Sequence, residues 1–250
     1  MMKAKCKNGG MGEVGDAKGI MEDDGNGGEG DMGGIFGAGG EFFGNLLYFW
    51  LIINHKIREM DAGKMKEEIR KACEVLREGG LILYPTDTIW GIGCDATNEE
   101  AVRRVFALKR REDSKAMLVL LDDVGRVPSY VEMPDVAYDL LEVADRPMTI
   151  IYPGAKHLAP SLVAADGSVG IRVTREAFSR GLVERFRRPV VSTSANVSGE
   201  PSPRCFAEIS EEVKRGVDYV VDFRQEETAN PAPSSIIKLG VGGEIQIIRK

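Results

Sequence analysis

The chain has 250 residues, of which 43% are hydrophobic and 29% charged, and its formal net charge is −6. These values are typical of a soluble globular protein with one large or two small domains. The acidic balance argues against a protein that coats nucleic acid, so any anion site must be local. Four widely spaced cysteines without a CxxC pair, beside only two histidines, exclude a recognisable zinc site and suggest reduced thiols in the cytoplasm.

Residues 1–64 differ from the rest of the chain. They hold 16 of the 30 glycines and show no regular apolar period, so we expect disorder there. The apolar run at 42–53 is shorter than the roughly twenty residues of a membrane span and follows no basic leader, so no membrane segment is predicted. Either this run docks loosely on the protein, or the functional protein begins at Met65 or Met60.

Regular structure is expected from residue 66 onward. Apolar residues between Ile69 and Leu76 share one helix face, and Gly79-Gly80 can supply a left-handed stop. Leu81–Tyr84 is predicted as a buried strand. A Pro-Thr-Asp-Thr turn follows, and then a loop punctuated by Gly91 and Gly93.

The next helix has a capping-box spacing at Thr97 and Glu100 and one apolar face. Its C-terminal end carries more cations than the helix dipole requires. The six cations are Arg103, Arg104, Lys109, Arg110, Arg111 and Lys115. A solvated basic helix end is the plain interpretation. Glycine and hydroxyl loops nearby favour instead a polyanionic ligand such as a nucleoside triphosphate.

The remaining segments alternate between strand and helix patterns. Strands are predicted at 117–121, 149–152, 168–174, 189–191 and 219–222, and a hairpin at 235–239 and 245–248. Helices are predicted from Pro134 to Val143, through Phe178, Leu182 and Phe186, and through Phe206, Ile209 and Val213. This order predicts an α/β domain with a mixed sheet.

Three polar features could bind an anion. The segment 192–196 places hydroxyls and a carboxamide after a buried strand, where phosphate or ribose is often bound, although an Asx or Ser turn would look the same. Lys109 and Arg111 can present a point charge and a planar fork to adjacent phosphates. Arg172 interrupts an apolar strand, so it must face a carboxylate partner or an anionic ligand.

Nucleophilic catalysis by the protein is poorly supported. There is no GxSxG elbow, and His157 lies in a loop rich in Pro and Ala, where a surface role is the simpler interpretation. No pair of acids has a spacing typical of glycosidases. The residues favour positioning and charge neutralisation, as in phosphoryl or nucleotidyl transfer from a triphosphate with Mg²⁺.

Five separated motifs, in order, resemble the threonylcarbamoyl-AMP synthase family (YrdC/TsaC-like, single-domain form). They are YPTDTIWGIG at 84–93, KxR at 109–111, SKAMLVL at 114–120, SVGIRVT at 168–174 and STSANVSG at 192–199. The resemblance covers 65–250, and it implies a twisted open mixed sheet with flanking helices and a concave basic face. It implies an enzyme that condenses L-threonine, bicarbonate and ATP to threonylcarbamoyl-AMP and pyrophosphate for tRNA threonylcarbamoyladenosine modification.

The resemblance also assigns roles to residues. Thr88, Arg172 and Ser194 would hold threonine, with Arg172 pairing its carboxylate. The ATP-binding residues would be Lys109, Arg111, Lys115, Ser168, Asn196 and Arg249, and the residues of the catalytic centre Lys109, Arg111, Ser194 and Asn196. ATP would bring Mg²⁺, and no metal site is expected in the protein itself. Separate proteins would transfer the product to tRNA, and weak tRNA or double-stranded RNA binding is a further expectation.

Two positions depart from the family pattern. Asp145-Arg146-Pro147-Met148 stands where a Trp-Pro-Gly-Pro run is common, and Arg204 stands where a small hydroxyl residue is expected. Three alternatives remain open at this point: a YciO-like paralogue without synthase activity, an RNA-binding YrdC-like module, and a carbamoyl-adenylate module of hydrogenase maturation. The intact Ser194–Asn196 element counts against the paralogue. The acidic net charge counts against the RNA-binding module, and the lack of accessory domains counts against the hydrogenase-maturation module.

Overall fold

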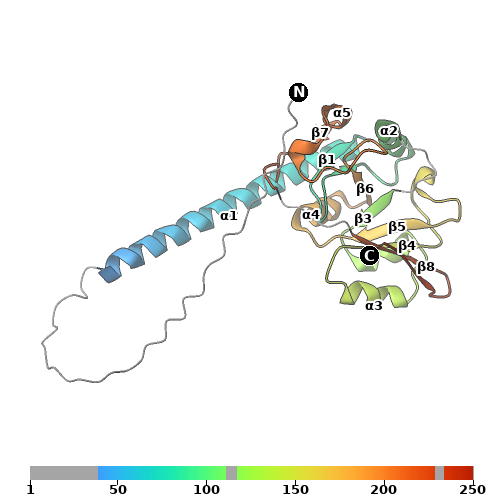
Figure 1. The fold of residues 1–250 in the computed structure, drawn as a ribbon, viewed down its shortest axis with the longest axis horizontal. Helices are drawn as coiled ribbons and strands as arrows, with labels where there is room; N and C mark the ends of the chain where they lie inside the picture. Colours follow the sequence, from blue (N-terminus) through green and yellow to red (C-terminus); the bar gives the residue numbers. More distant parts are fainter. Residues whose placement is uncertain (1–38, 111–116, 229–233, 250) are drawn as a thin grey trace, which may run out of the picture. The chain divides into compact units, whose positions relative to one another are not determined.

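A computed structural model of the protein describes residues 39–110, 117–228 and 234–249 (Figure 1). Within α1 it describes the side chains from residue 52 onward, except those of residues 54 and 57. The described chain falls into two units, residues 39–63 and 64–249. Two predicted anion-binding residues, Arg111 and Lys115, lie outside the described residues.

The first helix, α1 (Gly39–Arg77), is longer than the sequence analysis predicted. Disorder was expected up to residue 64, but residues 39–63 are helical, and residues 1–38 lie outside the described part. Five of the seven residues at 56–62 are good helix formers (Lys, Arg, Glu, Met and Ala), and they favour a helix even where no apolar period marks one. Gly79 has φ 78° and ends this element as predicted. Among the described residues, none of the helices combines the length and the apolar character that a membrane span requires.

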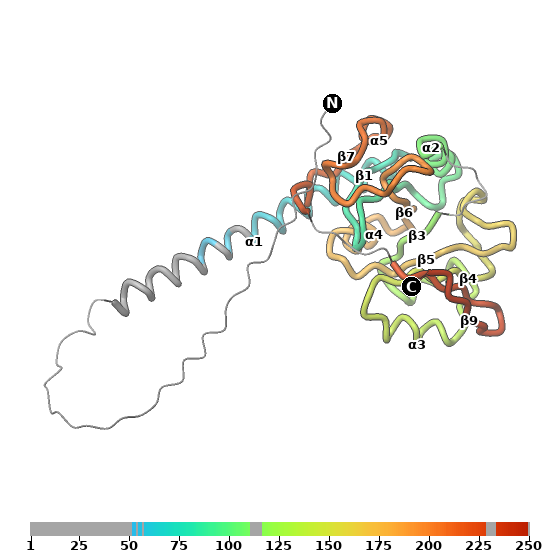
Figure 2. The backbone as a smooth tube through the Cα atoms, in the orientation of Figure 1, coloured from blue at the N-terminus to red at the C-terminus, as the bar shows by residue number. Residues whose placement is uncertain are grey.

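The described residues form one sheet of nine strands in the order β7-β1-β2-β6-β3-β5-β4-β8-β9. The pairs β1–β7, β3–β5 and β4–β8 are parallel and the others antiparallel, which confirms the predicted mixed sheet. The closing hairpin lies beside β4 (Figure 2). The strands are β1 (Ile82–Tyr84), β2 (Gly91–Gly93), β3 (Leu118–Leu121), β4 (Met148–Tyr152), β5 (Val169–Val173), β6 (Val190–Ser194), β7 (Tyr219–Val220), β8 (Ser235–Leu239) and β9 (Ile245–Arg249).

Strand β2 replaces the loop that Gly91 and Gly93 predicted. It runs antiparallel to β1 and pairs Gly93 with Ile82. A Cβ on Gly93 would lie 2.7 Å from the Tyr84 ring and 2.8 Å from the Val191 carbonyl oxygen. Glycine is needed here because backbones and a ring approach closely, which is one of the uses of glycine inside a strand.

The helices confirm the predicted positions with two corrections. They are α2 (Glu99–Lys109), α3 (Val136–Val143), α4 (Ala177–Phe186) and α5 (Glu211–Gly216), with short 3-10 turns η1 (Val124–Ser129), η2 (Pro160–Leu162) and η3 (Phe206–Glu208). The N-cap of α2 is Asn98, whose side chain accepts from the Ala101 amide, because Thr97 is bound to Asp95 instead. The single helix predicted through Phe206 and Val213 is split into η3 and α5.

Each face of the sheet carries its own apolar layer. On one face, α2 and α3 pack on residues such as Val119 and Ile171. On the other face, α4 and residues 69–76 of α1 pack on Leu120 and Tyr84. Side chains alternate along a strand, so the neighbours of Ile171 leave the sheet on the second face. Arg172 therefore points away from the larger apolar layer, as predicted.

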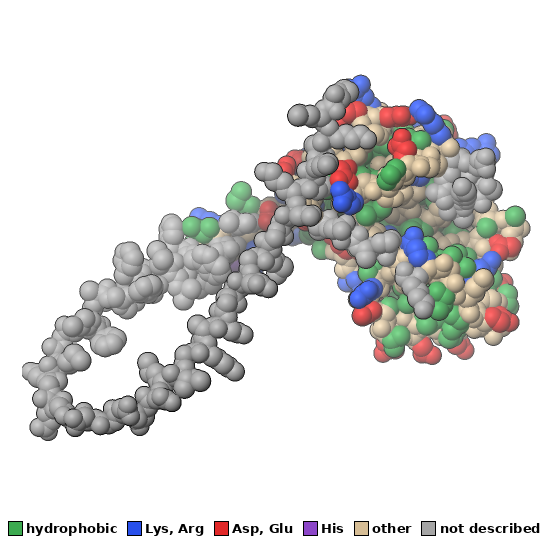
Figure 3. Space-filling view, viewed as in Figure 1, with side chains coloured by type: hydrophobic (Ala, Val, Ile, Leu, Met, Phe, Trp, Pro, Cys, Tyr) green, Lys and Arg blue, Asp and Glu red, His purple; other side chains and the backbone are tan. Residues whose placement is uncertain are grey.

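Hydrophobic side chains also reach the surface near the end of the sheet. Figure 3 shows them around the region where Figure 1 places α3. The most exposed ones there and on the hairpin are Tyr138, Val143, Val241, Ile245, Ile247 and Ile248. They lie away from the main cavity, whose lining does not include them.

Candidate functional site

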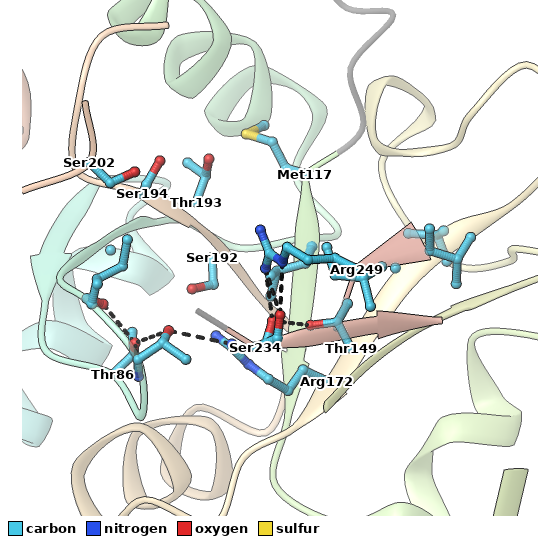
Figure 4. Close-up of a pocket in the computed structure, with 18 of the residues that line it drawn as sticks. Thr86, Met117, Thr149, Arg172, Ser192, Thr193, Ser194, Ser202, Ser234 and Arg249 are labelled. Carbon is cyan, nitrogen blue, oxygen red and sulfur yellow. Dashed lines mark hydrogen bonds between the residues drawn. The ribbon is translucent and has the colours of Figure 1, made fainter. Parts of the chain in front are cut away.

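A cavity of about 840 Å³ lies on the sheet face that α4 shares (Figure 4). Alternate residues of β3, β5, β4 and β8 form its floor, and Thr86, residues 88–91, the end of β6 and residues 202–204 form its walls. Its volume is within the range of about 300–1,000 Å³ that small-molecule sites occupy. Five predicted site residues line it: Thr88, Ser168, Arg172, Ser194 and Arg249.

Arg172 is the buried cation of the cavity floor, with 3% of the residue exposed. Its Nη1 donates to the Thr88 hydroxyl at 3.4 Å, and its Nη2 lies 3.2 Å from Asp87 Oδ1. Its Nε is buried without a hydrogen-bond partner in the described structure. Both alternatives from the sequence therefore apply: Arg172 has a carboxylate partner and still has a donor for an anion.

Asp87 contacts Arg172 from behind the cavity. It lines two smaller cavities of about 150 and 70 Å³ and is absent from the lining of the large one. Burial raises the pKa of the Asp87 carboxyl in spite of the nearby guanidinium, and burial lowers the pKa of Arg172. Both shifts reflect the cost of removing charge from water. The pair therefore only partly offsets the cost of burying the two charges, and Arg172 Nε has no hydrogen-bond partner in the described structure.

The Pro-Thr-Asp-Thr turn fixes two hydroxyls beside Arg172. Thr86 donates to the Ile89 carbonyl oxygen at 2.7 Å and accepts from the Thr88 amide at 3.1 Å. The two threonine hydroxyls lie 3.2 Å apart. These bonds explain why the turn needs hydroxyl residues on both sides of the aspartate, and they hold Thr88 toward the guanidinium.

Lys109 anchors the segment after β6. It is 2% exposed, and its Nζ donates to the carbonyl oxygens of Ser194 at 2.5 Å and Asn196 at 2.6 Å. The Ser194 hydroxyl donates to the Asn196 side chain. The structure thus brings together Lys109, Ser194 and Asn196, which the sequence placed in one site. In this arrangement Lys109 and Asn196 lie just behind the cavity lining.

The other described cations of α2 serve the surface. Arg103 pairs with Glu99, Arg104 with Asp218 and Arg110 with Glu212. All three arginine side chains are exposed.

The plain interpretation of a solvated basic helix end is therefore confirmed for these three residues, and none of them lines the cavity. Helical spacing carries Arg103, Arg104 and Arg110 to directions other than that of Lys109. The positive charges of these three arginines are balanced there by the ion pairs with Glu99, Asp218 and Glu212.

Ser168 lies at the start of β5 with its donors already engaged. Its hydroxyl donates to Asp166 Oδ1 at 2.6 Å and its amide to the same oxygen at 3.1 Å. Lys238 of β8 donates to Asp166 Oδ2 at 2.5 Å. These bonds hold the pKa of the Asp166 carboxyl well below its usual range. The sequence analysis missed Asp166 and Lys238, both of which line the cavity.

Arg249 closes the far side of the cavity from β9. Its Nε and Nη2 donate to the Ser234 carbonyl oxygen at 2.9 and 2.8 Å, and the Ser234 hydroxyl lies 3.1 Å from that of Thr149 (Figure 4). No acidic partner of Arg249 is present among the described residues. Its charge is close enough to lower the pKa of Arg172. Two cations facing one cavity attract an anion.

The two departures from the family pattern fall at different places. Arg204 lines the cavity mouth and pairs with Glu208 on the exposed side. Met148 begins β4 outside the main cavity, and residues 145–148 line the smaller cavity behind Asp87. His157 is exposed and bonds to the Ser129 carbonyl oxygen, consistent with a surface role.

The lining defines the chemistry that the cavity can support. It carries four cations (Arg172, Arg204, Lys238 and Arg249) and one carboxylate (Asp166) among its described residues. Nine Ser and Thr side chains add neutral hydrogen-bonding groups: Thr86, Thr88, Thr149, Ser168, Ser192, Thr193, Ser194, Ser202 and Ser234. Within the described residues, no three His, Cys, Asp or Glu side chains are grouped to hold a metal. Such a lining can bind and orient polyanions.

Known proteins resemble this chain over the same region. The Sua5/YciO/YrdC family model, described as telomere recombination, matches residues 74–250. A putative threonylcarbamoyl-AMP synthase of Methanocaldococcus jannaschii is 36% identical over 179 residues, which are 70% of this chain and 83% of that protein. A threonylcarbamoyl-AMP synthase of Pseudoalteromonas translucida is 32% identical over 181 residues, 71% of this chain and 95% of that protein.

A solved structure shares the fold as well. The Sua5 protein of P. abyssi, crystallised as a complex with L-threonine, is 28% identical with a TM-score of 0.64. The match covers 68% of this chain and 50% of that one, so this chain corresponds to about half of the solved protein. The family model spans well over half of the chain, and the curated relatives are matched over most of their length. The chain belongs to the Sua5/YciO/YrdC family.

Proposed function

We propose that this chain is an L-threonylcarbamoyladenylate synthase, a nucleotidyltransferase that joins L-threonine, bicarbonate and ATP. The names of its relatives and the threonine complex of a similar protein favour this function over the paralogue and RNA-binding alternatives. The observation that carries the proposal is Arg172, a buried arginine with a free Nε beside Thr88 on the floor of a large cavity.

Threonine would bind at the Arg172 end. Its carboxylate would take the unused guanidinium edge in a charge-assisted hydrogen bond, and the Thr88 hydroxyl would contact the amino acid. A buried arginine gains most from such a ligand, since the anion removes part of the penalty of burying its charge. Ser194, at the wall where β6 ends, would lie between the amino acid and the nucleotide.

ATP would occupy the rest of the cavity, toward Arg249 and Ser234. It would bring its Mg²⁺ coordinated by phosphate oxygens, as in other phosphoryl-transfer enzymes. Lys109 would act by fixing the Ser194–Asn196 segment through its two carbonyl contacts. Contacts of Arg111 and Lys115 with the triphosphate stay predictions.

The reaction requires two bond-forming steps. The threonine amine attacks bicarbonate and forms a carbamate with release of water. A carbamate oxygen then attacks the α-phosphorus, the bond to the bridging α–β oxygen breaks, and pyrophosphate leaves with the bonding electrons. The protein holds two anions side by side against their repulsion, which proximity and fixed cations accomplish. Cytoplasmic transfer proteins would then use the product to modify tRNA.

The proposal is tested with the full-length chain, labelled bicarbonate, ATP, Mg²⁺ and either L-threonine or L-valine. Valine has nearly the same shape as threonine without its hydroxyl. We expect label in a threonylcarbamoyl-AMP product with threonine and little with valine, detected by chromatography and mass spectrometry. A chain that binds ATP and threonine yet forms no labelled adduct would refute the synthase function.

A further inference from the structure

Lys238 is a cavity cation to which the proposed function gives no role. It lies on β8, where it pairs with Ile151 of β4 and Gln246 of β9. Ile236, two residues earlier, pairs with Arg249. Residues two apart on a strand share a face, so Lys238 and Ile236 both line the cavity. Lys238 thus stands on the half of the cavity that includes Arg249.

Asp166 is the partner of Lys238 in this structure. Three donors converge on its carboxylate: the Lys238 ammonium, the Ser168 hydroxyl and the Ser168 amide. An ammonium, a hydroxyl and a backbone amide are also the groups with which proteins bind phosphate. The carboxylate therefore occupies a set of donors that would suit an external anion.

The Lys238–Asp166 pair can be exchanged at little cost. The lysine side chain is 37% exposed and the aspartate side chain 52% exposed, whereas the Arg172 and Asp87 side chains are 3% and 11% exposed. Exposed ion pairs contribute little to stability because water and salt screen them. A multiply charged phosphate chain is a stronger partner for an ammonium than a single exposed carboxylate.

We propose that Lys238 is a phosphate-binding residue, which leaves Asp166 and binds a phosphate of the nucleotide when the cavity fills. Until the nucleotide binds, Asp166 holds the Lys238 ammonium group in place. Asp166 and the nucleotide therefore compete for this ammonium group. The identity of the anion as ATP rests on the proposed function. The assignment adds a cation from β8 to the predicted set.

The test measures binding by calorimetry on the full-length chain, with ATP and with adenosine as ligands. Lys238→Gln is expected to raise the Kd for ATP about tenfold, the contribution of one charged hydrogen bond, and to leave adenosine binding unchanged. Lys238→Arg keeps the charge and is expected to retain most of the affinity. Lys156→Gln, which removes an exposed lysine outside the lining, is the matched control and should bind ATP like the wild type.

The Asp166→Asn variant distinguishes two roles of Asp166: a carboxylate that competes with the nucleotide for Lys238, and a residue that is needed to hold Lys238 in its binding position. Its amide oxygen can still accept from Ser168, but it no longer attracts Lys238. We expect this variant to bind ATP about two to five times more tightly than the wild type. Weaker binding, comparable with that of Lys238→Gln, would overturn the proposal because it would show that the intact pair is required.

Other results also decide the question. An unchanged ATP Kd in Lys238→Gln would overturn the phosphate role while leaving the synthase proposal standing. An equal loss of adenosine affinity would overturn it too, since the variant would then have disturbed the whole cavity. Normal ATP binding and the expected variant effects, without threonine-dependent chemistry, would uphold Lys238 and refute the synthase function.

Discussion

The two ends of the cavity hold their charges in different ways. At the buried end, Arg172 and Asp87 face each other inside the protein, and each keeps a polar atom without a hydrogen-bond partner in the described structure. At the exposed end, Lys238 pairs with Asp166 near solvent, and Arg249 bonds to the Ser234 carbonyl oxygen. Burial fixes geometry at one end, and exposure allows partners to exchange at the other.

This difference suits the two ligands that we propose. An amino acid offers one small carboxylate, so its recognition depends on the position of a single guanidinium. A triphosphate offers several charges along a flexible chain, so it tolerates cations that move. Changes at the buried end should therefore alter stability and the chemistry together, whereas changes at the exposed end should mainly alter affinity.

The largest effect is expected for Arg172→Ala. The kcat/KM for threonine should fall by about three orders of magnitude, because truncating one partner of a buried charge pair costs about 2–5 kcal/mol. Initial rates of pyrophosphate release measure it. Arg103→Ala, on the exposed face of α2, is the control and should stay within about twofold of the wild type. Equal rates of pyrophosphate release in the two variants would show that Arg172 takes no part in the reaction.

Asp87→Asn should have the next largest effect, and it should appear in stability. Leaving the Arg172 charge buried without its partner costs about 3–5 kcal/mol of unfolding free energy, measured by urea denaturation. Adding Arg172→Met should restore most of that stability without restoring activity. Glu212→Gln, which breaks an exposed pair with Arg110, should change stability by less than about 1 kcal/mol. If Asp87→Asn lost no more unfolding free energy than Glu212→Gln, the Arg172–Asp87 pair would behave like an exposed ion pair, which would contradict its burial.

Salt should affect ligand binding differently at the two ends of the cavity, and this effect should be smaller than those of the substitutions above. Raising ionic strength from about 0.1 to about 1 M shortens the Debye length from about 10 to about 3 Å, which screens exposed charges far more than buried ones. The Kd for ATP should rise severalfold, and the Kd for threonine should change less. Calorimetric titrations in both buffers measure this, with adenosine as an uncharged reference. A larger salt effect on threonine than on ATP would reverse the comparison.

The smallest effect is expected in the pH dependence of stability, where Asp166 should contribute at acid pH. Its pKa lies below the usual 3.8 in the folded protein because Lys238 and Ser168 stabilise its charged form. Such a group adds stability above its unfolded pKa, and this stability is lost as the pH falls below about 4 toward the folded pKa. The exposed position limits the contribution to less than about 1 kcal/mol. The stability gap between wild type and Asp166→Asn should thus close between about pH 5 and pH 2, and a constant gap would contradict the shift.

Much of the fold could be predicted because local patterns decide it. The closing hairpin and the direction of Arg172 followed from alternation along β8, β9 and β5. Strand β2 did not, since its two glycines signal a loop when the neighbouring ring of Tyr84 is unknown. The N-cap of α2 was misplaced by one residue because Asp95 engages Thr97, a contact that spacing alone does not reveal.

The candidate site was predictable where one residue breaks a pattern. Arg172 stands between Ile171 and Val173, and that interruption drew attention to it. Lys238 stands between Ile237 and Leu239 in the same way, so this signal was present but unused. Its partner Asp166 lies 72 residues away, and no local pattern could supply that contact.

The most direct test of the account is pyrophosphate release by the full-length chain with ATP, Mg²⁺ and bicarbonate, measured with and without L-threonine. The account predicts release that depends on threonine and is lost in Arg172→Ala while Arg103→Ala keeps it. Release that is independent of threonine, or none from a folded chain that binds both ligands, would contradict the proposal that this cavity joins threonine to the nucleotide.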